Sequence, residues 1–96
     1  MAKALWVTTY RTVKDATKLA DYGKLAGPAI TGGGGVFLAR GPALQAYEEG
    51  VKERVVVIQF DSVEAAVATH DGAAYQAALK VLGDGAVRDI RIVEGA

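Results

Sequence analysis

The sequence predicts an α+β fold: a ferredoxin-like βαββαβ sandwich, formed as a single domain over residues 1–96. The first observation behind this prediction is the order of the periodic segments, which follow one another as β-α-β-β-α-β. The second is that the strand-like segments are apolar on both faces, which predicts a second layer over the sheet. A length of 96 residues permits one hydrophobic core and is too short for two.

The first strand is predicted over residues 3–10, which are rich in β-prone types. Asp15 is the expected N-cap of the first helix, because its carboxylate can accept hydrogen bonds from the free amides of the first turn. Gly27-Pro28 interrupts this helix, and because proline has no amide hydrogen we expect a kink or a helix restart there. The apolar residues at helical spacing are Leu19, Tyr22, Leu25 or Ala26, and Ala29 or Ile30.

Four consecutive glycines, residues 32–35, follow this helix and precede a strand. A phosphate-binding loop has the opposite order, since the amides and dipole that hold the anion lie at the start of a helix. No Gly-Lys-Ser/Thr follows, and the G-x-G-x-x-G spacing before a helix is absent from the sequence. We therefore interpret the glycines as a helix C-cap with a tight turn, a backbone conformation that glycine adopts at low cost.

The second strand is predicted over Val36–Ala39, with Leu44–Tyr47 as an optional continuation. Glu49-Gly50 is expected to form a hairpin turn into the third strand, Arg54–Phe60. Strict alternation in the second strand places Val36 and Leu38 on one face and Phe37 and Ala39 on the other.

The second helix is expected to start at a cap formed by Asp61 or Ser62, with Glu64 in the first turn, where the helix dipole favours an anion. Gly72 breaks the helical periodicity before a second segment, and the last strand is predicted over Val87–Glu94. The helical stripe comprises Val63, Ala66, Val67 and His70, then Tyr75, Ala78, Leu79 and Leu82; the last strand has Ile90 and Ile92 opposite Asp89 and Arg91.

Three strands are apolar on both faces, although both helices are expected to cover the same face of the sheet. Strands covered on both sides have near-continuous apolar runs, whereas a sheet with one wet face alternates. A second copy of the sheet is the simplest cover, so we expect a two-fold homodimer with the second and third strands in its interface. The alternative is a monomer with a partly apolar open face. The residues concerned are Leu5 and Val7 opposite Trp6, Val36 and Leu38 opposite Phe37 and Ala39, and Val55 and Val57 opposite Val56, Ile58 and Phe60.

The composition restricts the classes of function. Eleven basic residues balance eleven acidic ones, so no net field favours nucleic acid or an anionic membrane as a partner. The chain has no cysteine, which excludes disulfides, thiolate metal sites and cysteine nucleophiles. The longest aliphatic run, Val55–Ile58, is far shorter than the roughly 18 residues of a membrane helix, and the first residues lack the apolar core of a signal peptide. We expect a cytoplasmic protein without a cofactor.

Several segments, taken in order, resemble a bacterial domain-of-unknown-function family, number thirteen-thirty, of the dimeric α+β barrel superfamily. They are LAGPAI at 25–30, GGVFLARG at 34–41, RVVVIQF at 54–60, EAA at 64–66, YQA at 75–77 and IVEG at 92–95. The resemblance runs from Ala4 to Gly95 and implies a ferredoxin-like subunit whose sheet packs on a partner's sheet. At 69–73 the chain has THDGA where the family commonly carries an aromatic pair and Ser-Pro, and an arginine expected near 83–84 is absent. The resemblance implies no particular activity.

His70 is the only histidine, and histidine is the side chain whose ordinary pKa lies near neutrality. It lies on the helical stripe, so we expect it to face the sheet or a crevice beside it, and it is the candidate catalytic acid or base. The alternative is a half-buried histidine that pairs with Asp71 or with the backbone. A metal site is not expected, because the positions three and four residues away hold only alanine and valine.

Arg40 ends an apolar strand, where we expect it at the mouth of a pocket between the sheet and the helices. Its guanidinium group can hold a carboxylate or phosphate through two hydrogen bonds; the alternatives are a solvated arginine or an ion pair between subunits. Tyr22, Tyr75 and Trp6 are expected to line this pocket, with their polar atoms orienting a ligand, unless they are plain core. Thr8 and Tyr10 share the face of Trp6 by strand alternation.

These residues lead to three hypotheses of function. The first is a homodimer that binds a small, partly apolar molecule, with an acid as a candidate, in a cleft formed by Arg40, His70, Tyr22, Tyr75 and Trp6. The second is a cofactor-independent enzyme of the monooxygenase or isomerase type, with His70 as its catalytic residue, by analogy with other dimeric α+β barrels. The third is a structural dimerisation module without a ligand.

Overall fold

The computed structural model describes residues 2–96, which form a four-stranded antiparallel sheet and three helices. The order of strands in the sheet is β2-β3-β1-β4. This is the ferredoxin-like α+β fold predicted from the sequence, with the second helical region divided in two. The elements are β1 (Ala4–Val13), α1 (Ala16–Gly32), β2 (Val36–Pro42), β3 (Arg54–Phe60), α2 (Val63–Asp71), α3 (Ala73–Leu82) and β4 (Ala86–Glu94).

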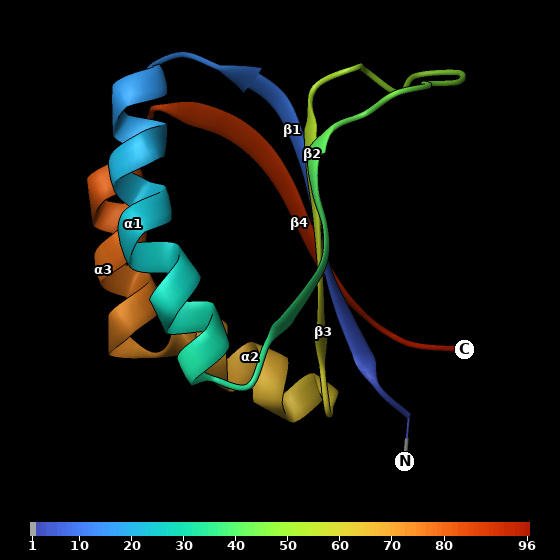
Figure 1. The fold of residues 1–96 in the computed structure, drawn as a ribbon, viewed down its shortest axis with the longest axis vertical. Coiled ribbons are helices and arrows are strands. Elements are labelled where there is room, and N and C mark those ends of the chain that lie inside the picture. The colour runs from blue at the N-terminus through green and yellow to red at the C-terminus, as the bar shows by residue number, and fades with distance from the viewer. Residues whose placement is uncertain (1) are drawn as a thin grey trace.

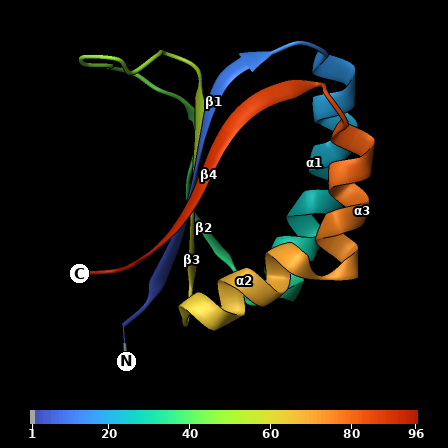
Figure 2. The same cartoon turned by 180° about the vertical axis from the view of Figure 1, so that it is seen from behind.

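All the helices of residues 2–96 lie on one face of the sheet, and the opposite face carries none of the described elements (Figures 1 and 2). We call these the inner face and the open face. Side chains of β1 alternate between them: Trp6 is buried on the inner face, whereas Leu5 and Val7 on the open face are only half-buried. The largest fully buried side chains are Trp6, Ile58, Phe60 and Tyr75.

Helix α1 begins at its predicted cap and continues through the proline. The amide of Lys18 donates to the Asp15 carboxylate at 3.0 Å. The predicted alternative of a helix restart at Gly27-Pro28 is wrong, because α1 is assigned without a break to Gly32. Pro28 removes only the bond to the carbonyl of Lys24, and both residues are exposed, so water can satisfy that carbonyl.

The glycine run after α1 forms the predicted C-cap and turn. The amide of Gly33 donates to the carbonyl of Ala29 at 3.1 Å, and the amide of Gly35 to that of Ile30 at 2.9 Å. Gly34 has a φ of 95°, which strongly favours glycine. A Cβ atom on Gly35 would lie 2.6 Å from Cγ2 of Ile30 and 2.8 Å from Cζ of Phe60. The run therefore brings the start of β2 into close contact with the core.

The connection between β2 and β3, residues 43–53, is a projecting loop that we call the arm. The sequence predicted Leu44–Tyr47 as an optional continuation of the second strand, which is wrong because β2 ends at Pro42. The predicted turn is present one residue earlier than expected: the amide of Gly50 donates to the carbonyl of Tyr47 at 2.9 Å. The arm extends away from the helices, beyond the open face (Figures 1 and 2).

Gly72 divides the second helical region into α2 and α3, as its place in the apolar stripe predicted. Ser62 is the cap of α2, because its hydroxyl accepts a hydrogen bond from the amide of Ala65 at 3.1 Å. Asp61, the other candidate cap, instead accepts a hydrogen bond from Lys3 at 2.7 Å. No helix within residues 2–96 combines the length and the apolar character needed to span a membrane.

Candidate functional site

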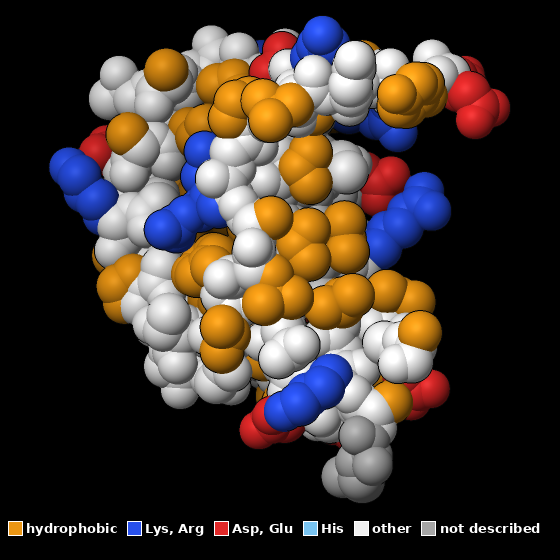
Figure 3. Space-filling view, turned by 45° about the vertical axis from the view of Figure 1, so that its right-hand side comes forward, with side chains coloured by type: hydrophobic (Ala, Val, Ile, Leu, Met, Phe, Trp, Pro, Cys, Tyr) orange, Lys and Arg blue, Asp and Glu red, His pale blue; other side chains and the backbone are white. Residues whose placement is uncertain are grey.

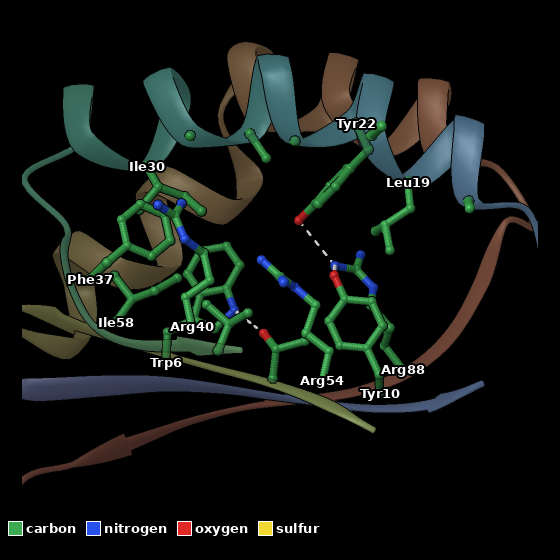
Figure 4. Close-up of a pocket in the computed structure, with 17 residues that line it drawn as sticks. Trp6, Tyr10, Leu19, Tyr22, Ile30, Phe37, Arg40, Arg54, Ile58 and Arg88 are labelled. Atoms are coloured by element: carbon green, nitrogen blue, oxygen red, sulfur yellow. Dashed lines mark hydrogen bonds between the residues drawn. The ribbon is translucent and has the colours of Figure 1, made fainter. Parts of the chain in front are cut away.

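A cavity of about 330 Å³ lies between α1 and the inner face of the sheet (Figure 4). Helix α1 lines one side with Leu19, Tyr22, Ala26 and Ile30. These residues are three or four positions apart, so they share one face of the helix. The inner face of the sheet lines the other side.

The strand register arranges the inner face into rows that cross the sheet. Antiparallel pairing places residues of neighbouring strands directly opposite one another. Thr9 pairs with Val55, so the next residues along the two strands, Tyr10 and Arg54, are neighbours. Tyr10 also pairs with Arg88 on its other side. The rows are Phe37 with Ile58, Trp6 and Ile92; then Arg40 with Val56, Thr8 and Ile90; then Arg54 with Tyr10 and Arg88.

A β-bulge in β2 brings Arg40 to the cavity. Phe37 pairs with Ile58 but Ala39 pairs with Val57, so Leu38 is an extra residue in the ladder. The bulge reverses the alternation that follows, which places Ala39 on the open face and Arg40 on the inner face. The prediction that Phe37 and Ala39 share a face is therefore wrong. The Arg40 guanidinium carbon lies 4.3 Å from the centroid of the Phe37 ring.

Arg88 of β4 is fixed to the wall of the cavity by tyrosine hydroxyl groups. Its Nη1 atom donates to the hydroxyl of Tyr22 at 3.0 Å and lies 3.5 Å from that of Tyr10. The hydroxyls of Tyr22 and Tyr75 are 2.6 Å apart and share a hydrogen bond. Burial opposes the charge of Arg88, but the nearby tyrosine oxygens outweigh that effect and raise its pKa. The guanidinium group is thus charged and oriented before any ligand arrives.

Arg40, Arg54 and Arg88 line the cavity without a balancing carboxylate among residues 2–96. The residues that line the cavity include no aspartate or glutamate. The ion pairs found in this part of the chain involve other basic side chains, namely Lys3, Arg11, Lys18, Lys24, His70 and Arg91. A chain with no net charge therefore concentrates positive charge in its cavity.

The aromatic side chains extend from the cavity wall into the core behind it. Trp6 lines the cavity, and its indole Nε1 donates to the hydroxyl of Thr8 at 2.9 Å. Tyr75 packs edge-on against Trp6 with 4.9 Å between ring centroids. Tyr75 itself is buried and does not line the cavity. Burial, together with the adjacent Tyr22, raises the pKa of Tyr75, so this hydroxyl stays protonated at neutral pH.

His70 lies outside the cavity, in a separate shallow hollow with Val67, Ile90 and Ile92. Its Nδ1 atom is 3.0 Å from Oδ1 of Asp71, the pairing that the sequence offered as the alternative to a catalytic role. Its ring also packs near Trp6, at 5.4 Å between ring centroids. The structure therefore does not bring His70 and Arg40 into one site.

Of the predicted ligand-binding residues, Trp6, Tyr22 and Arg40 line the cavity, whereas Tyr75 and His70 do not. Sequence reasoning missed Arg54 and Arg88. Arg88 could have been found, because it has the same strand parity as Ile90 and Ile92, which were placed together on one side. Arg54 has the parity of Val56 and Ile58 on β3 and could have been found in the same way.

The titratable side chains that line the cavity are arginines and tyrosines. Arginine keeps its charge and tyrosine keeps its proton at neutral pH, so this set suits the binding and orientation of an anion more than proton transfer. Within residues 2–96, no three His, Asp or Glu side chains lie close enough together to hold a metal ion.

A family model described as "Domain of unknown function (DUF1330)" matches residues 3–96. No curated protein matches the chain. Among solved structures, a protein of unknown function from Rhodopseudomonas palustris is similar, with a TM-score of 0.77 at 19% identity, and the match covers 99% of this chain and 83% of the other.

Two further solved structures have the same fold. A Caulobacter crescentus protein named "putative antibiotic biosynthesis monooxygenase" has a TM-score of 0.65 at 18% identity, with 99% of this chain and 91% of that chain covered. A dimeric ferredoxin-like protein of unknown function from Thermobifida fusca has a TM-score of 0.53 at 18% identity, with the same coverage of 99% and 91%. At these identities, the likeness shows the fold.

Proposed function

The chain belongs to the family described as domain of unknown function DUF1330, and we propose that this member is a homodimer that binds a small, partly apolar acid in the cavity under α1. The observation that carries the proposal is the set of three arginines, Arg40, Arg54 and Arg88, in a cavity whose lining has no acidic residue. An anion is the ligand that balances this charge. Guanidinium groups bind carboxylates and phosphates through paired, charge-assisted hydrogen bonds.

We propose that the acid group of the ligand lies between the guanidinium groups of Arg54 and Arg88. Both side chains are half-buried, and a charge interaction is stronger where water is partly excluded. Arg88 donates through Nη1 to tyrosine, which leaves Nε and Nη2 for a ligand. Arg40 is exposed, so it acts at the rim of the cavity.

The rest of the ligand is apolar and small. The cavity wall beyond the arginines is mostly apolar, and its large apolar side chains include Ile30, Trp6 and Ile58 (Figure 4). A volume of about 330 Å³ is at the lower end of the roughly 300–1,000 Å³ that small-molecule sites occupy. A short aliphatic or single-ring acid matches this combination of charge, size and apolar surface.

A comparison of acids with their amides tests this proposal. Trp6 is the only tryptophan and lines the cavity, so its fluorescence reports occupancy directly. We expect benzoate, phenylacetate or hexanoate to quench or shift this emission with saturation, whereas the matched neutral amides bind at least about tenfold more weakly. His70→Gln serves as the control and leaves the affinity unchanged. Equal binding of acid and amide would contradict the proposal.

The homodimer is proposed to form through the open face. Hydrophobic side chains gather on this side of the molecule (Figure 3), and Val36 and Val93 are 55% and 52% exposed. Monomeric proteins rarely leave large contiguous apolar patches in water. A second copy with the same face buries both patches under two-fold symmetry. The Thermobifida fusca protein of the same fold is described as dimeric, which supports a dimer here.

An enzyme of the cofactor-independent monooxygenase type is the second candidate, supported by the name of the Caulobacter crescentus protein and by the aromatic lining of the cavity. His70, the catalytic candidate, lies in a different hollow, so a reaction in this cavity would have to use other groups. Oxygen consumption on addition of quinols tests this candidate. Turnover that is lost in Arg88→Gln and kept in His70→Gln would favour it over binding alone.

A further inference from the structure

The arm, residues 43–53, exposes an unusual amount of apolar surface. Leu44 is 87% exposed and Tyr47 is 77% exposed, which makes them the two most exposed large hydrophobic residues within residues 2–96. Val51, on the return side of the arm, is also exposed. Single exposed apolar residues are ordinary, but three on one projecting segment of 11 residues concentrate apolar surface in water.

The arm has a defined backbone, although few of its side chains are buried. The amide of Ala43 donates to the carbonyl of Glu53 at 3.0 Å, which closes the base of the arm. The turn from Tyr47 to Gly50 closes its tip, and within it Glu48 has a φ of 55°. A non-glycine residue in this left-handed region is uncommon and mildly strained. The backbone therefore holds Leu44 and Tyr47 out in solvent.

The direction and length of the arm indicate what covers it. The arm projects on the side of the open face, away from the helices (Figures 1 and 2). Two sheets that pack face to face lie about 10 Å apart. The five residue-to-residue steps from Pro42 to Tyr47 reach up to roughly 16 Å at about 3.3 Å per step. The arm is thus long enough to pass the interface and lie against the side of a second copy.

The charges of the arm and of the open face are complementary. The tip of the arm carries Glu48 and Glu49. The open face carries Arg11 and Arg91, which share the single carboxylate of Asp89 at 3.7 and 3.1 Å. A second copy therefore offers an excess of positive charge to the acidic tip, and such complementarity favours this partner and its orientation.

We propose that the arm of each subunit clasps the second copy of the chain and buries Leu44, Tyr47 and Val51 against it. This clasp rests on the homodimer proposed above and extends its interface beyond the sheet. Because the two arms are related by the two-fold axis, the two clasps are equivalent and each arm contacts the same surface of the other subunit.

Dilution experiments with an arm variant test the clasp. In Leu44→Ser/Tyr47→Ser, we expect the dimer dissociation constant from sedimentation equilibrium to rise at least about tenfold, since two large apolar contacts are lost per subunit. Val81→Ser is the matched control, because Val81 is exposed on α3, on the helical side. Val81→Ser should have a dimer dissociation constant within about twofold of the wild-type value. Circular dichroism confirms that both variants are folded.

Crosslinking locates the arm directly. The chain has no cysteine, so Tyr47→Cys and Val81→Cys each carry one benzophenone-maleimide label. Light should convert Tyr47→Cys, and not Val81→Cys, into a covalent dimer. If Val57→Lys on the open face abolishes the dimer, while Leu44→Ser/Tyr47→Ser dimerises as tightly as wild type and Tyr47→Cys yields no crosslink, the clasp is wrong and the open-face dimer stands. If the wild type is a monomer, both proposals are wrong.

Discussion

The two faces of the sheet differ in how their charges are balanced, and this difference separates two kinds of binding surface. On the open face, Arg11 and Arg91 share Asp89 at 3.7 and 3.1 Å. On the inner face, Arg54 and Arg88 line a cavity that has no carboxylate in its wall. Apolar side chains alone do not distinguish the faces, since both have them.

The comparison suggests how each surface is completed. The open face is apolar, and its two arginines share one carboxylate, so a second copy can cover it with a like surface and meet the remaining positive charge with its acidic arm. A partly buried cation without a carboxylate to balance its charge is costly, and an anionic ligand relieves that cost. The open face therefore suits self-association, and the inner cavity suits a small acid.

A lysine on the open face is expected to have the largest effect. Val57 lies on the open face of β3, and Val57→Lys places a charge in the centre of the proposed interface. An unpaired buried charge costs roughly 3–5 kcal/mol, so we expect the dimer to weaken at least about a hundredfold. Light scattering at micromolar concentration should give the mass of a monomer, whereas Val81→Lys on α3 stays dimeric. An unchanged dimer mass in Val57→Lys would place the interface elsewhere.

A methyl group at Gly35 tests how tightly the inner face is packed. The added carbon would lie within 3 Å of side-chain atoms of Ile30 and Phe60, so we expect Gly35→Ala to lower the free energy of unfolding by about 1–3 kcal/mol. Gly32→Ala is the matched control, since nothing lies within 4 Å of the added carbon. It should leave stability unchanged or raise it slightly. Urea denaturation compares the stabilities of the two variants. Equal stabilities would show that Ile30 and Phe60 can shift to accommodate the added methyl group.

Two neighbouring threonines of β1 compare the faces within one strand. Thr8 accepts the indole hydrogen bond of Trp6 in the core, and Thr9 is exposed on the open face. Thr8→Val leaves the buried indole without an acceptor, which we expect to cost about 1–2 kcal/mol of unfolding free energy. Thr9→Val should stay within about 0.5 kcal/mol of wild type. Urea denaturation at one protein concentration measures the unfolding free energy of both variants. Similar losses of stability in Thr8→Val and Thr9→Val would contradict the expected difference between the two faces.

The smallest effect is expected from Tyr75 at alkaline pH. Burial, with a further contribution from Tyr22, raises the pKa of Tyr75 above the ordinary tyrosine value of about 10. The unfolded chain then loses this proton before the folded one, so stability is present below pH 10 and falls as the pH rises further. Tyr75→Phe should show a shallower fall in melting temperature between pH 9 and 11. Val81→Ser, which leaves every tyrosine in place, should follow wild type; parallel curves for all three proteins would contradict the assignment.

The sequence predicted the faces of residues that follow strict periodicity. Trp6, Thr8 and Tyr10 were placed together by alternation, and Asp15 and Gly72 were recognised from local chemistry. Arg88 was overlooked, although strand alternation puts it on the same face as Ile90 and could have identified it.

The position of Arg40 depends on the bulge at Leu38, and the residue types around Leu38 do not predict a bulge. With strict alternation, Arg40 would lie on the open face with Val36. His70 was correctly placed on the helical stripe. However, whether it meets Arg40 depends on which strands α2 covers, and among the strands α2 packs mainly against β1 and β4. Such tertiary choices are not encoded in a local pattern.

The most direct test of the central claim is the preference for an acid over its amide, measured by calorimetry in wild type, Arg88→Gln and Arg11→Gln. We expect wild type to prefer the acid at least about tenfold. Arg88→Gln should lose most of this preference while it still binds the amide, because only the charge contact is removed. Arg11→Gln, on the open face, should keep it. A preference that persists in Arg88→Gln, or no binding of either molecule by wild type, would contradict the account.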